Sequence, residues 1–398
     1  MSKPLCCFLS FLLCFSAMAE KQPPPMRVTV AQLEQVLAAD GGKPDAKLAL
    51  QLSGMELTER MSSARLSSWK ARLPGAKAKA ALVALADLSA FLIPPLAEIS
   101  SDAPPETAAQ QRMISMTDDY LEKTIPKLPN FFATRTTVSY QEVMPNDEQL
   151  KWNELIIGSL RSTDSSTTTV HYRDGYDFVD TAAEKGRKPN SQYSTMDTIG
   201  TFGQFLIAMV PVVANRELTW SRWELGAGGA RAVFRYAVPE KNSHYEVIFC
   251  CLPEGDGTDV FKMHPGYHGE IMIDPDSGTI LRLTVVADMQ PKLPIARADI
   301  MVESGPVVIG GKTYICPVRS VSILRDKTVT HFQMGNEYGQ QYRTFGPYMT
   351  MLDDVSFTDY HVFRSESRIL TGDEPVPEEQ WSNPGSTGMP ATKQKTKP

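Results

Sequence analysis

The stretch that decides the fold is YHGEIMIDPDSGTILRLTVVA, residues 267–287. Two apolar runs, Tyr267–Ile273 and Thr279–Ala287, flank the short segment DPDSG at 274–278. Asp-Pro followed by a glycine is typical of a tight turn, because proline fixes φ and glycine tolerates a positive φ. The flanking runs are rich in β-branched residues, which favour strands. The stretch therefore predicts an antiparallel β-hairpin.

The same strand–turn–strand pattern recurs along the chain. Three further pairs of strand-like runs flank short turn sequences. They are Thr168–Arg173 and Tyr176–Asp180 around DG at 174–175, Leu218–Leu225 and Arg231–Val238 around GAGG at 226–229, and Val307–Ile309 and Lys312–Ile315 around GG at 310–311. Additional strands are expected at 133–140, 318–324, 329–334 and 355–363. One helical segment, 198–214, interrupts the series. Successive hairpins predict a large antiparallel β domain over 126–371 with one inserted helix.

The region 28–125 has a helical period instead. Thr29 with Gln32 three residues later forms the sequence signature of a capping box. Five short amphipathic segments follow, separated by glycine and proline punctuation. We expect an all-α N-terminal domain in which short helices pack side by side, and hence an α+β chain.

The N-terminus has the three parts of a secretory signal peptide. Lys3 precedes the apolar run 5–15, and Ala17-Met18-Ala19 supplies small residues for cleavage before Glu20. Removal of residues 1–19 leaves a Pro-rich linker at 20–27, and the polar, proline-rich tail 372–398 is expected to be disordered. The protein is thus predicted to be exported to the periplasm or outside the cell. Lipidation at Cys14, and with it membrane association, stays open as an alternative.

Composition narrows the class of protein. The chain has 398 residues, of which 42% are hydrophobic and 22% charged, as in ordinary folded proteins. Its 40 basic and 46 acidic residues give a formal net charge of −6. A weakly acidic chain lacks the electrostatic footprint of a nucleic-acid-binding protein, so no nucleic-acid partner is expected.

Three cysteines remain after removal of the signal peptide: Cys250, Cys251 and Cys316. Cys250 and Cys251 are neighbours in a strand-like run, so their side chains are expected to point to opposite faces. Only one of them can then share a face with Cys316. The sequence leaves two alternatives, a disulfide between Cys316 and Cys250 or Cys251, and three buried thiols.

No catalytic motif of a nucleophilic hydrolase, phosphate-binding loop or dinucleotide-binding loop occurs, and no cofactor is expected. The densest polar cluster holds His264, His268 and Glu270, with His268 and Glu270 on one face of the predicted strand. These residue types bind metals, so the cluster is a candidate metal site. Alternating polar residues are equally what the solvent face of a sheet requires.

The inserted helix carries a different candidate site. Phe202, Phe205, Leu206 and Met209 recur at helical spacing in an apolar segment. Such a stripe is expected either to pack in the core or to plug a concave face of the sheet.

The chain from 131 to 368 resembles a group of uncharacterised exported bacterial proteins. The matching pieces are LPNF at 128–131, YHGEIMIDPDSGTILR at 267–282, VVIGGKTY at 307–314, residues 357–363 and SR at 367–368, and ALVALADLSAFLIPP at 81–95 is similar to a companion segment of that group. The hairpin at 267–282 is also similar to the LolA, LolB and RseB type of periplasmic half-barrel. The resemblance implies a curled antiparallel sheet around an apolar cavity that binds an acyl chain or lipidated protein.

Three functional hypotheses follow. The first is a non-catalytic module that binds an acyl chain, lipid or lipoprotein segment through Phe202, Phe205, Leu206 and Met209. The second is a structural envelope protein that docks a partner through residues 28–125. The third is a metal-dependent hydrolase around His264, His268 and Glu270.

Overall fold

The computed structural model describes residues 25–40, 42–124, 127–142, 159–173, 176–179, 196, 198, 204–215, 217–226, 228–254, 258–333 and 341–363. Residues 1–363 form one compact unit and Arg364–Pro398 a second. All described residues belong to the first unit. The predicted signal peptide with Cys14, residues 20–24 of the predicted linker, the C-terminal tail and Phe202 lie outside the described residues, while residues 26 and 27 of that linker belong to β1.

The α+β fold class is confirmed, but the N-terminal region is helical rather than all-α, which corrects that part of the expectation. Its elements are β1 (Met26–Val28), α1 (Val30–Asp40), α2 (Asp45–Ser53), β2 (Met55–Leu57), α3 (Ser63–Arg72), α4 (Ala76–Leu88) and η1 (Leu96–Glu98). Strands β1 and β2 pair in parallel. The capping box is confirmed: the Thr29 amide donates to Gln32 Oε1 at 2.9 Å, and the Gln32 amide donates to Thr29 Oγ1 at 3.2 Å.

The remaining strands form a ten-stranded antiparallel sheet of order β5-β4-β3-β14-β13-β12-β11-β10-β7-β6. The bounds are β3 Phe131–Glu142, β4 Leu160–Arg173, β5 Tyr176–Val179, β6 Thr219–Gly226, β7 Gly229–Val238, β10 Tyr267–Ile273, β11 Ile280–Ala287, β12 Ile295–Ile309, β13 Lys312–Gln333 and β14 Gln341–Val362. All four predicted hairpins are present. Gly310 and Gly311 both have positive φ, as a two-residue hairpin turn requires.

Two details of the β domain differ from the sequence-based expectation. The strands expected at 318–324 and 329–334 belong to one long strand, β13, whose register shifts between Lys327 and Val329. A separate two-stranded sheet joins β8 (Val247–Cys250) to β9 (Val260–Met263). The inserted helix is α8 (Gln204–Ala214). The curling of the large sheet stays a prediction.

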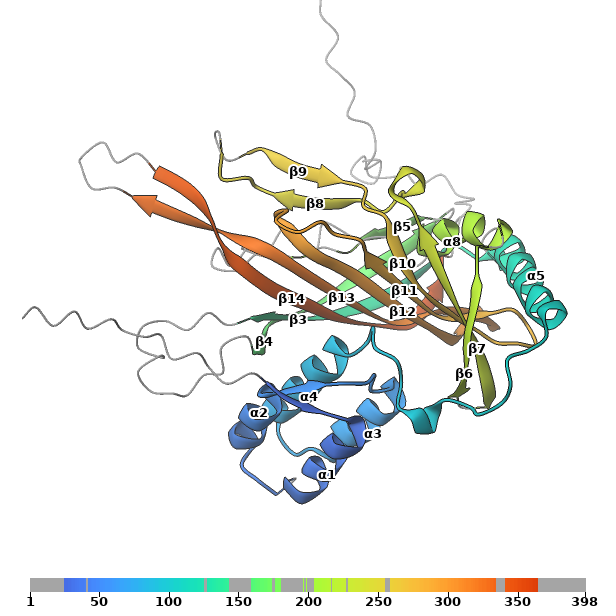
Figure 1. The fold of residues 1–398 in the computed structure, drawn as a ribbon, viewed down its shortest axis with the longest axis horizontal. Coiled ribbons are helices and arrows are strands. Elements are labelled where there is room, and N and C mark those ends of the chain that lie inside the picture. The colour runs from blue at the N-terminus through green and yellow to red at the C-terminus, as the bar shows by residue number, and fades with distance from the viewer. Residues whose placement is uncertain are drawn as a thin grey trace, which may run out of the picture. The chain divides into compact units, whose positions relative to one another are not determined.

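The two faces of the large sheet are covered differently (Figure 1). On the face that we call the N-terminal face, buried side chains of β12–β14 pack with those of α1–α4, among them Met301, Val321 and Leu352. On the opposite face, which we call the cavity face, Phe234 and Ile271 pack with α8 and with α5 (Thr107–Thr124). The fifth predicted helix therefore leaves the expected N-terminal bundle and crosses to the other side of the sheet.

Candidate functional site

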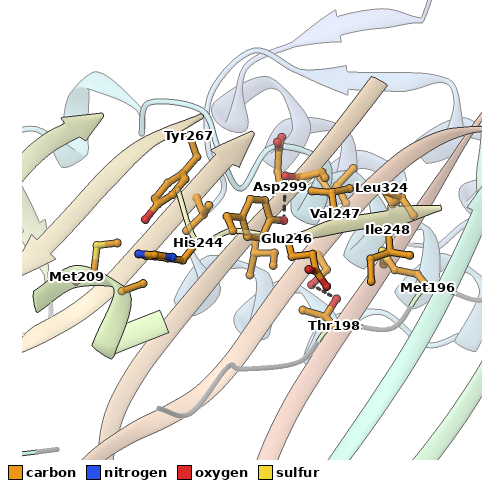
Figure 2. A pocket seen from close by; sticks show the side chains of 17 residues that line it. Met196, Thr198, Met209, His244, Glu246, Val247, Ile248, Tyr267, Asp299 and Leu324 are labelled. Atoms are coloured by element: carbon orange, nitrogen blue, oxygen red, sulfur yellow. Dashed lines mark hydrogen bonds between the residues drawn. The ribbon is translucent and has the colours of Figure 1, made fainter. Parts of the chain in front are cut away.

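A cavity of about 450 Å³ lies on the cavity face of the sheet (Figure 2). Its lining comes from three places: strands β10–β13, helix α8 with residues 196 and 198, and the segment 244–248 that leads into β8. This volume lies within the range of sites that hold small organic ligands. The cavity is therefore our candidate binding site.

The floor of the cavity is largely apolar. It is formed by side chains that point to the same side of neighbouring strands, because Val285 pairs with Ile300 and Ile300 pairs with Ser322. Paired residues of an antiparallel sheet share a face. Ala298 and Leu324 continue this floor one step along β12 and β13. A row of aliphatic side chains is suited to contact a hydrocarbon group.

Helix α8 covers one side of the cavity. Met209 is fully buried, lines the cavity and packs with the core of the cavity face, while Ala208 is half-buried and also lines it. Leu206 packs against the same core but does not line the cavity. Phe205 lies in α8, and its side chain is outside the described part of the chain, as is Phe202. Of the predicted apolar stripe, the structure thus places Met209 at the site.

Polar groups gather where Thr198 and the segment 244–248 meet the sheet. The Thr198 hydroxyl donates to Ser322 Oγ at 3.0 Å, and the Tyr245 hydroxyl donates to the carbonyl of Ala298 at 3.2 Å. Burial raises the pKa of Tyr245 and also that of Tyr267. Both phenols therefore remain neutral at physiological pH.

Glu246 is the acidic residue at this polar edge. Its Oε2 pairs with Lys262 of β9 and lies 3.4 Å from Nε2 of His264. The cavity thus has an apolar floor and one polar, ion-paired edge. Such an arrangement can hold an amphipathic molecule with its apolar part against β11–β13.

The predicted metal-ligating residues have separate partners. His268 Nδ1 lies 2.7 Å from Asp288 Oδ1. The two carboxylate oxygens of Glu270 accept hydrogen bonds from the two terminal guanidinium nitrogens of Arg222, each at 2.6 Å. His268 and Glu270 do lie on one face of β10, as predicted, but His264 precedes that strand and meets Glu246. Within the described ranges, no group of three His, Cys, Asp or Glu side chains is placed to hold a metal ion.

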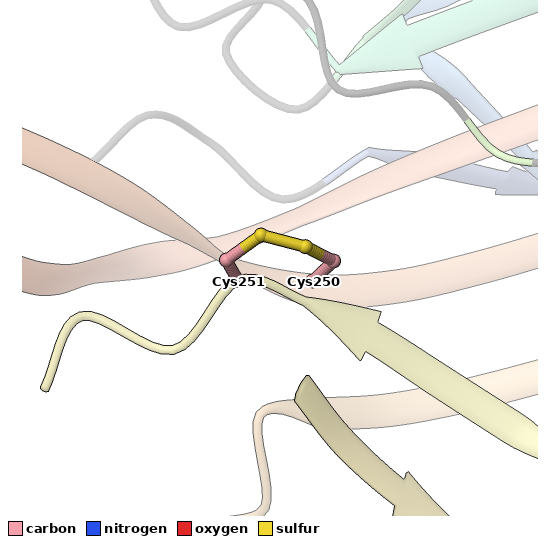
Figure 3. The surroundings of a disulfide bond; sticks show 2 residues. All are labelled: Cys250 and Cys251. Carbon is pink, nitrogen blue, oxygen red and sulfur yellow. A yellow bond between two sulfur atoms is a disulfide. The ribbon is translucent and has the colours of Figure 1, made fainter. Parts of the chain in front are cut away.

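The cysteine pairing differs from both alternatives left open by the sequence. Cys250 and Cys251 form a disulfide with each other, and Cys316 is a buried free thiol (Figure 3). Cys316 lies in β13 among the side chains around Phe131, a separate core from that of β8. Because the expected partners lie in different cores, the predicted bridge does not form. Burial raises the pKa of the Cys316 thiol to about 12.

Sequence reasoning missed the segment 244–248. Its run of valine, isoleucine and phenylalanine correctly indicates a strand, but nothing local shows that Tyr245 and Val247 line a cavity. The contribution of His244 and Glu246 likewise depends on where β8 lies over the sheet. Only the alternation of buried and exposed residues in β8 could have been found from the sequence.

No helix in the described ranges is both long enough and apolar enough to cross a membrane.

Comparisons with known proteins found similarity at the level of structure. No protein-family model matches the sequence, and no curated protein matches it. The fold is similar to a solved structure of a LolA superfamily protein from Nitrosomonas europaea, with a TM-score of 0.22 and 8% sequence identity. The match covers 66% of this chain and 97% of that chain.

Proposed function

We propose that the protein is an exported, non-catalytic binding module that holds an acyl chain or another single hydrocarbon group in the cavity of the large sheet. The observation that carries the proposal is the cavity of about 450 Å³ itself, with its aliphatic floor of Val285, Ile300 and Leu324. If a methylene group takes up about the volume of one water molecule, roughly 30 Å³, the space matches a chain of roughly 15 such groups.

The chemistry of the lining supports an amphipathic ligand over a purely apolar one. Thr198, Ser322 and the ion-paired Glu246 lie at one edge, where a polar head group can keep hydrogen bonds. Met209 on the covering helix has a flexible, polarizable side chain that adapts to chains of different shape. A curled sheet around this ligand is part of the proposal.

The test is native mass spectrometry of the purified protein, followed by titration with a fluorescent fatty acid. We expect a co-purifying acyl species that leaves on denaturation, and saturable binding of the probe. Ala208→Trp places an indole at the cavity lining and should weaken probe binding by about tenfold or more. Ala214→Trp, at an exposed position of the same helix, is the matched control.

Equal probe binding by both tryptophan variants, or no binding by the unmodified protein, would overturn the proposal. If Ala208→Trp fails to fold, Ile300→Phe provides a second way to reduce the cavity, from the strand side.

A second candidate function, docking of a partner protein by the N-terminal region, has one observation in its favour. Leu96 in η1 is 85% exposed. Leu92 and Ile93, a few residues before it, are also exposed, as is Leu225 in β6, the strand that η1 contacts. Exposed apolar groups that cluster favour protein–protein contact. Chemical cross-linking in an extract of exported proteins tests this candidate: a cross-linked partner of the unmodified protein should be lost with Leu96→Glu.

A further inference from the structure

One half of the N-terminal face is not covered by α1–α4. Along β3, Val138 and Tyr140 pack against the N-terminal helices, whereas Thr134 and Thr136, which alternate with them on the same face, do not belong to that core. The exposed half extends over four strands, β5, β4, β3 and β14, in the order of the sheet.

Register places an aromatic row at the end of this exposed half. Phe178 pairs with His171, His171 pairs with Phe132, and Phe132 pairs with His361. The Phe132 ring centroid lies 6.3 Å from that of His171 and 5.2 Å from that of His361. Phe363 adds an edge contact to Phe132 at 6.5 Å. Phe178 and Phe363 are 55% and 58% exposed, so the row offers ring surface to a ligand.

A grid of hydroxyl groups follows the aromatic row. Its two lines across β4, β3 and β14 consist of Thr169, Thr134 and Thr358, and of Thr167, Thr136 and Ser356. Neighbouring strands are about 4.8 Å apart, so the grid is a regular array of donors and acceptors. Thr358 Oγ1 donates to Asp359 at 3.0 Å, and within the described part of the chain the other five hydroxyls make no side-chain hydrogen bond.

The charge of the surface limits what it can bind. The six hydroxyl residues and three phenylalanines carry no charge. The charged groups beside them are of both signs: Asp359 accepts from Thr358, Arg173 follows His171 by two residues on β4, and Asp354 pairs with Arg319 at 2.9 Å. A lipid surface would remove water from the hydroxyls without replacing their hydrogen bonds, which costs free energy. A polyanion would find no cluster of lysine or arginine in the two rows.

We propose that this surface, which we call the hydroxyl–aromatic face, binds a neutral polysaccharide. A sugar ring presents an apolar C–H side that packs on an aromatic ring and an edge of hydroxyls that pairs with other hydroxyls. A chain of such rings matches an aromatic row that continues into a hydroxyl grid. This site lies on the opposite side of the sheet from the cavity and is independent of the function proposed for it.

The experiment is titration of the whole purified protein with soluble neutral oligosaccharides, namely oligomers of N-acetylglucosamine, of β-1,4-linked glucose and of α-1,4-linked glucose. Dextran sulfate serves as the polyanion. We expect binding of at least one neutral oligomer. The pair of substitutions Phe178→Ala and Phe363→Ala should weaken it by about tenfold. Thr167→Val with Thr358→Val, which keep the side-chain shape and remove two hydroxyls, should also weaken it.

Val260→Ala, an exposed substitution in the separate β8–β9 sheet, is the matched control and should bind like the unmodified protein. Ala208→Trp should lose the fatty-acid probe and keep the oligosaccharide. The proposal is overturned if no neutral oligomer binds, if only dextran sulfate binds, or if the phenylalanine and threonine variants bind as tightly as the Val260→Ala control.

Discussion

Apolar packing attaches helices to both faces of the large sheet, and on the N-terminal face buried ion pairs are added to it. On the N-terminal face, Arg319 pairs with Asp87 of α4, and Arg60 pairs with Glu224 of β6 at 2.5 Å, all of them largely buried. On the cavity face, α5 and α8 attach through apolar side chains such as Met113 and Met209.

The difference between the two faces concerns how strictly the helices are positioned on the sheet as well as how much free energy holds them there. Apolar packing is non-directional, so by itself it fixes the arrangement of the helices less strictly than hydrogen-bonded charges do. A buried ion pair contributes little net free energy but is costly to break, and its hydrogen bonds fix one arrangement. Our hypothesis is that the N-terminal face sets a unique position for α1–α4, while the cavity face leaves room for a guest.

The largest expected effect is at Arg319. Arg319→Met should lower the free energy of unfolding by about 3–5 kcal/mol, because it leaves both Asp87 and Asp354 without the guanidinium that they share. Burial and the nearby carboxylate of Asp354 raise the pKa of Asp87, and Arg319 opposes this rise. Urea denaturation measures the change. The double variant Arg319→Met with Asp87→Leu should recover part of the loss, because Asp354 still lacks its cation, and a single-variant loss below about 1 kcal/mol would contradict the assigned role.

The apolar counterpart is Ile271, which is fully buried on the cavity face. Ile271→Ala should cost about 3 kcal/mol through lost apolar contact and the space left behind. The cost should be nearly independent of pH, whereas that of Arg319→Met depends on the ionisation of the buried carboxyl of Asp87. Denaturation at several pH values separates the two, and an equal pH dependence for both variants would remove the contrast between the faces.

A third prediction uses Asp326, a buried carboxyl in β13 that pairs in register with Ile295. Burial raises the pKa of Asp326 to about 7. The folded state therefore favours the protonated form, while the unfolded chain ionises near its ordinary value. Stability contributed by this group is present at low pH and is lost as the pH rises from about 4 to about 7.

Asp326→Asn should remove this loss. Relative to the unmodified protein, the variant should gain up to about 4 kcal/mol in unfolding free energy between acid and neutral pH, because each unit of pKa shift corresponds to about 1.4 kcal/mol. Thermal or urea denaturation at several pH values gives the difference between the two proteins, which isolates Asp326 from other titrating groups. A difference that does not change with pH would show that Asp326 is already ionised in the folded state.

Sequence reasoning succeeded where the signal is local. The hairpins at 174–175, 274–278 and 310–311 depend on turn residues next to alternating strands, so each pair of strands is specified by a short stretch. The capping box of Thr29 and Gln32 is local in the same way. The β1–β2 pair escaped because each strand has three residues and the two are separated by α1 and α2.

Features that depend on distant contacts were not accessible. An amphipathic pattern shows that α5 has an apolar face, but not that this face packs with α8 on the far side of the sheet. The stripe on α8 includes Met209, which lines the cavity, whereas the segment 244–248 has no local sign that it lines the cavity. The alternation Phe132, Thr134, Thr136 is visible in the sequence, but only the register with β4 and β14 turns it into a surface.

The smallest expected effect concerns an ion pair that remains in contact with solvent. Arg65 donates to both oxygens of Glu34 at 2.8 and 2.9 Å and to Glu98 at 2.5 Å, and its side chain is 35% exposed. These contacts raise the pKa of Arg65, against the effect of burial. Water reaches all three groups, so their charges remain solvated when one partner is removed. Arg65→Met should therefore lower the free energy of unfolding by about 0.5–1 kcal/mol, several times less than Arg319→Met, in the same denaturation assay.

If the two arginine variants lose equal stability, burial is not what distinguishes the ion pairs of the N-terminal face. The ion pairs of Arg65 would then hold the N-terminal region together as firmly as those that attach it to the sheet.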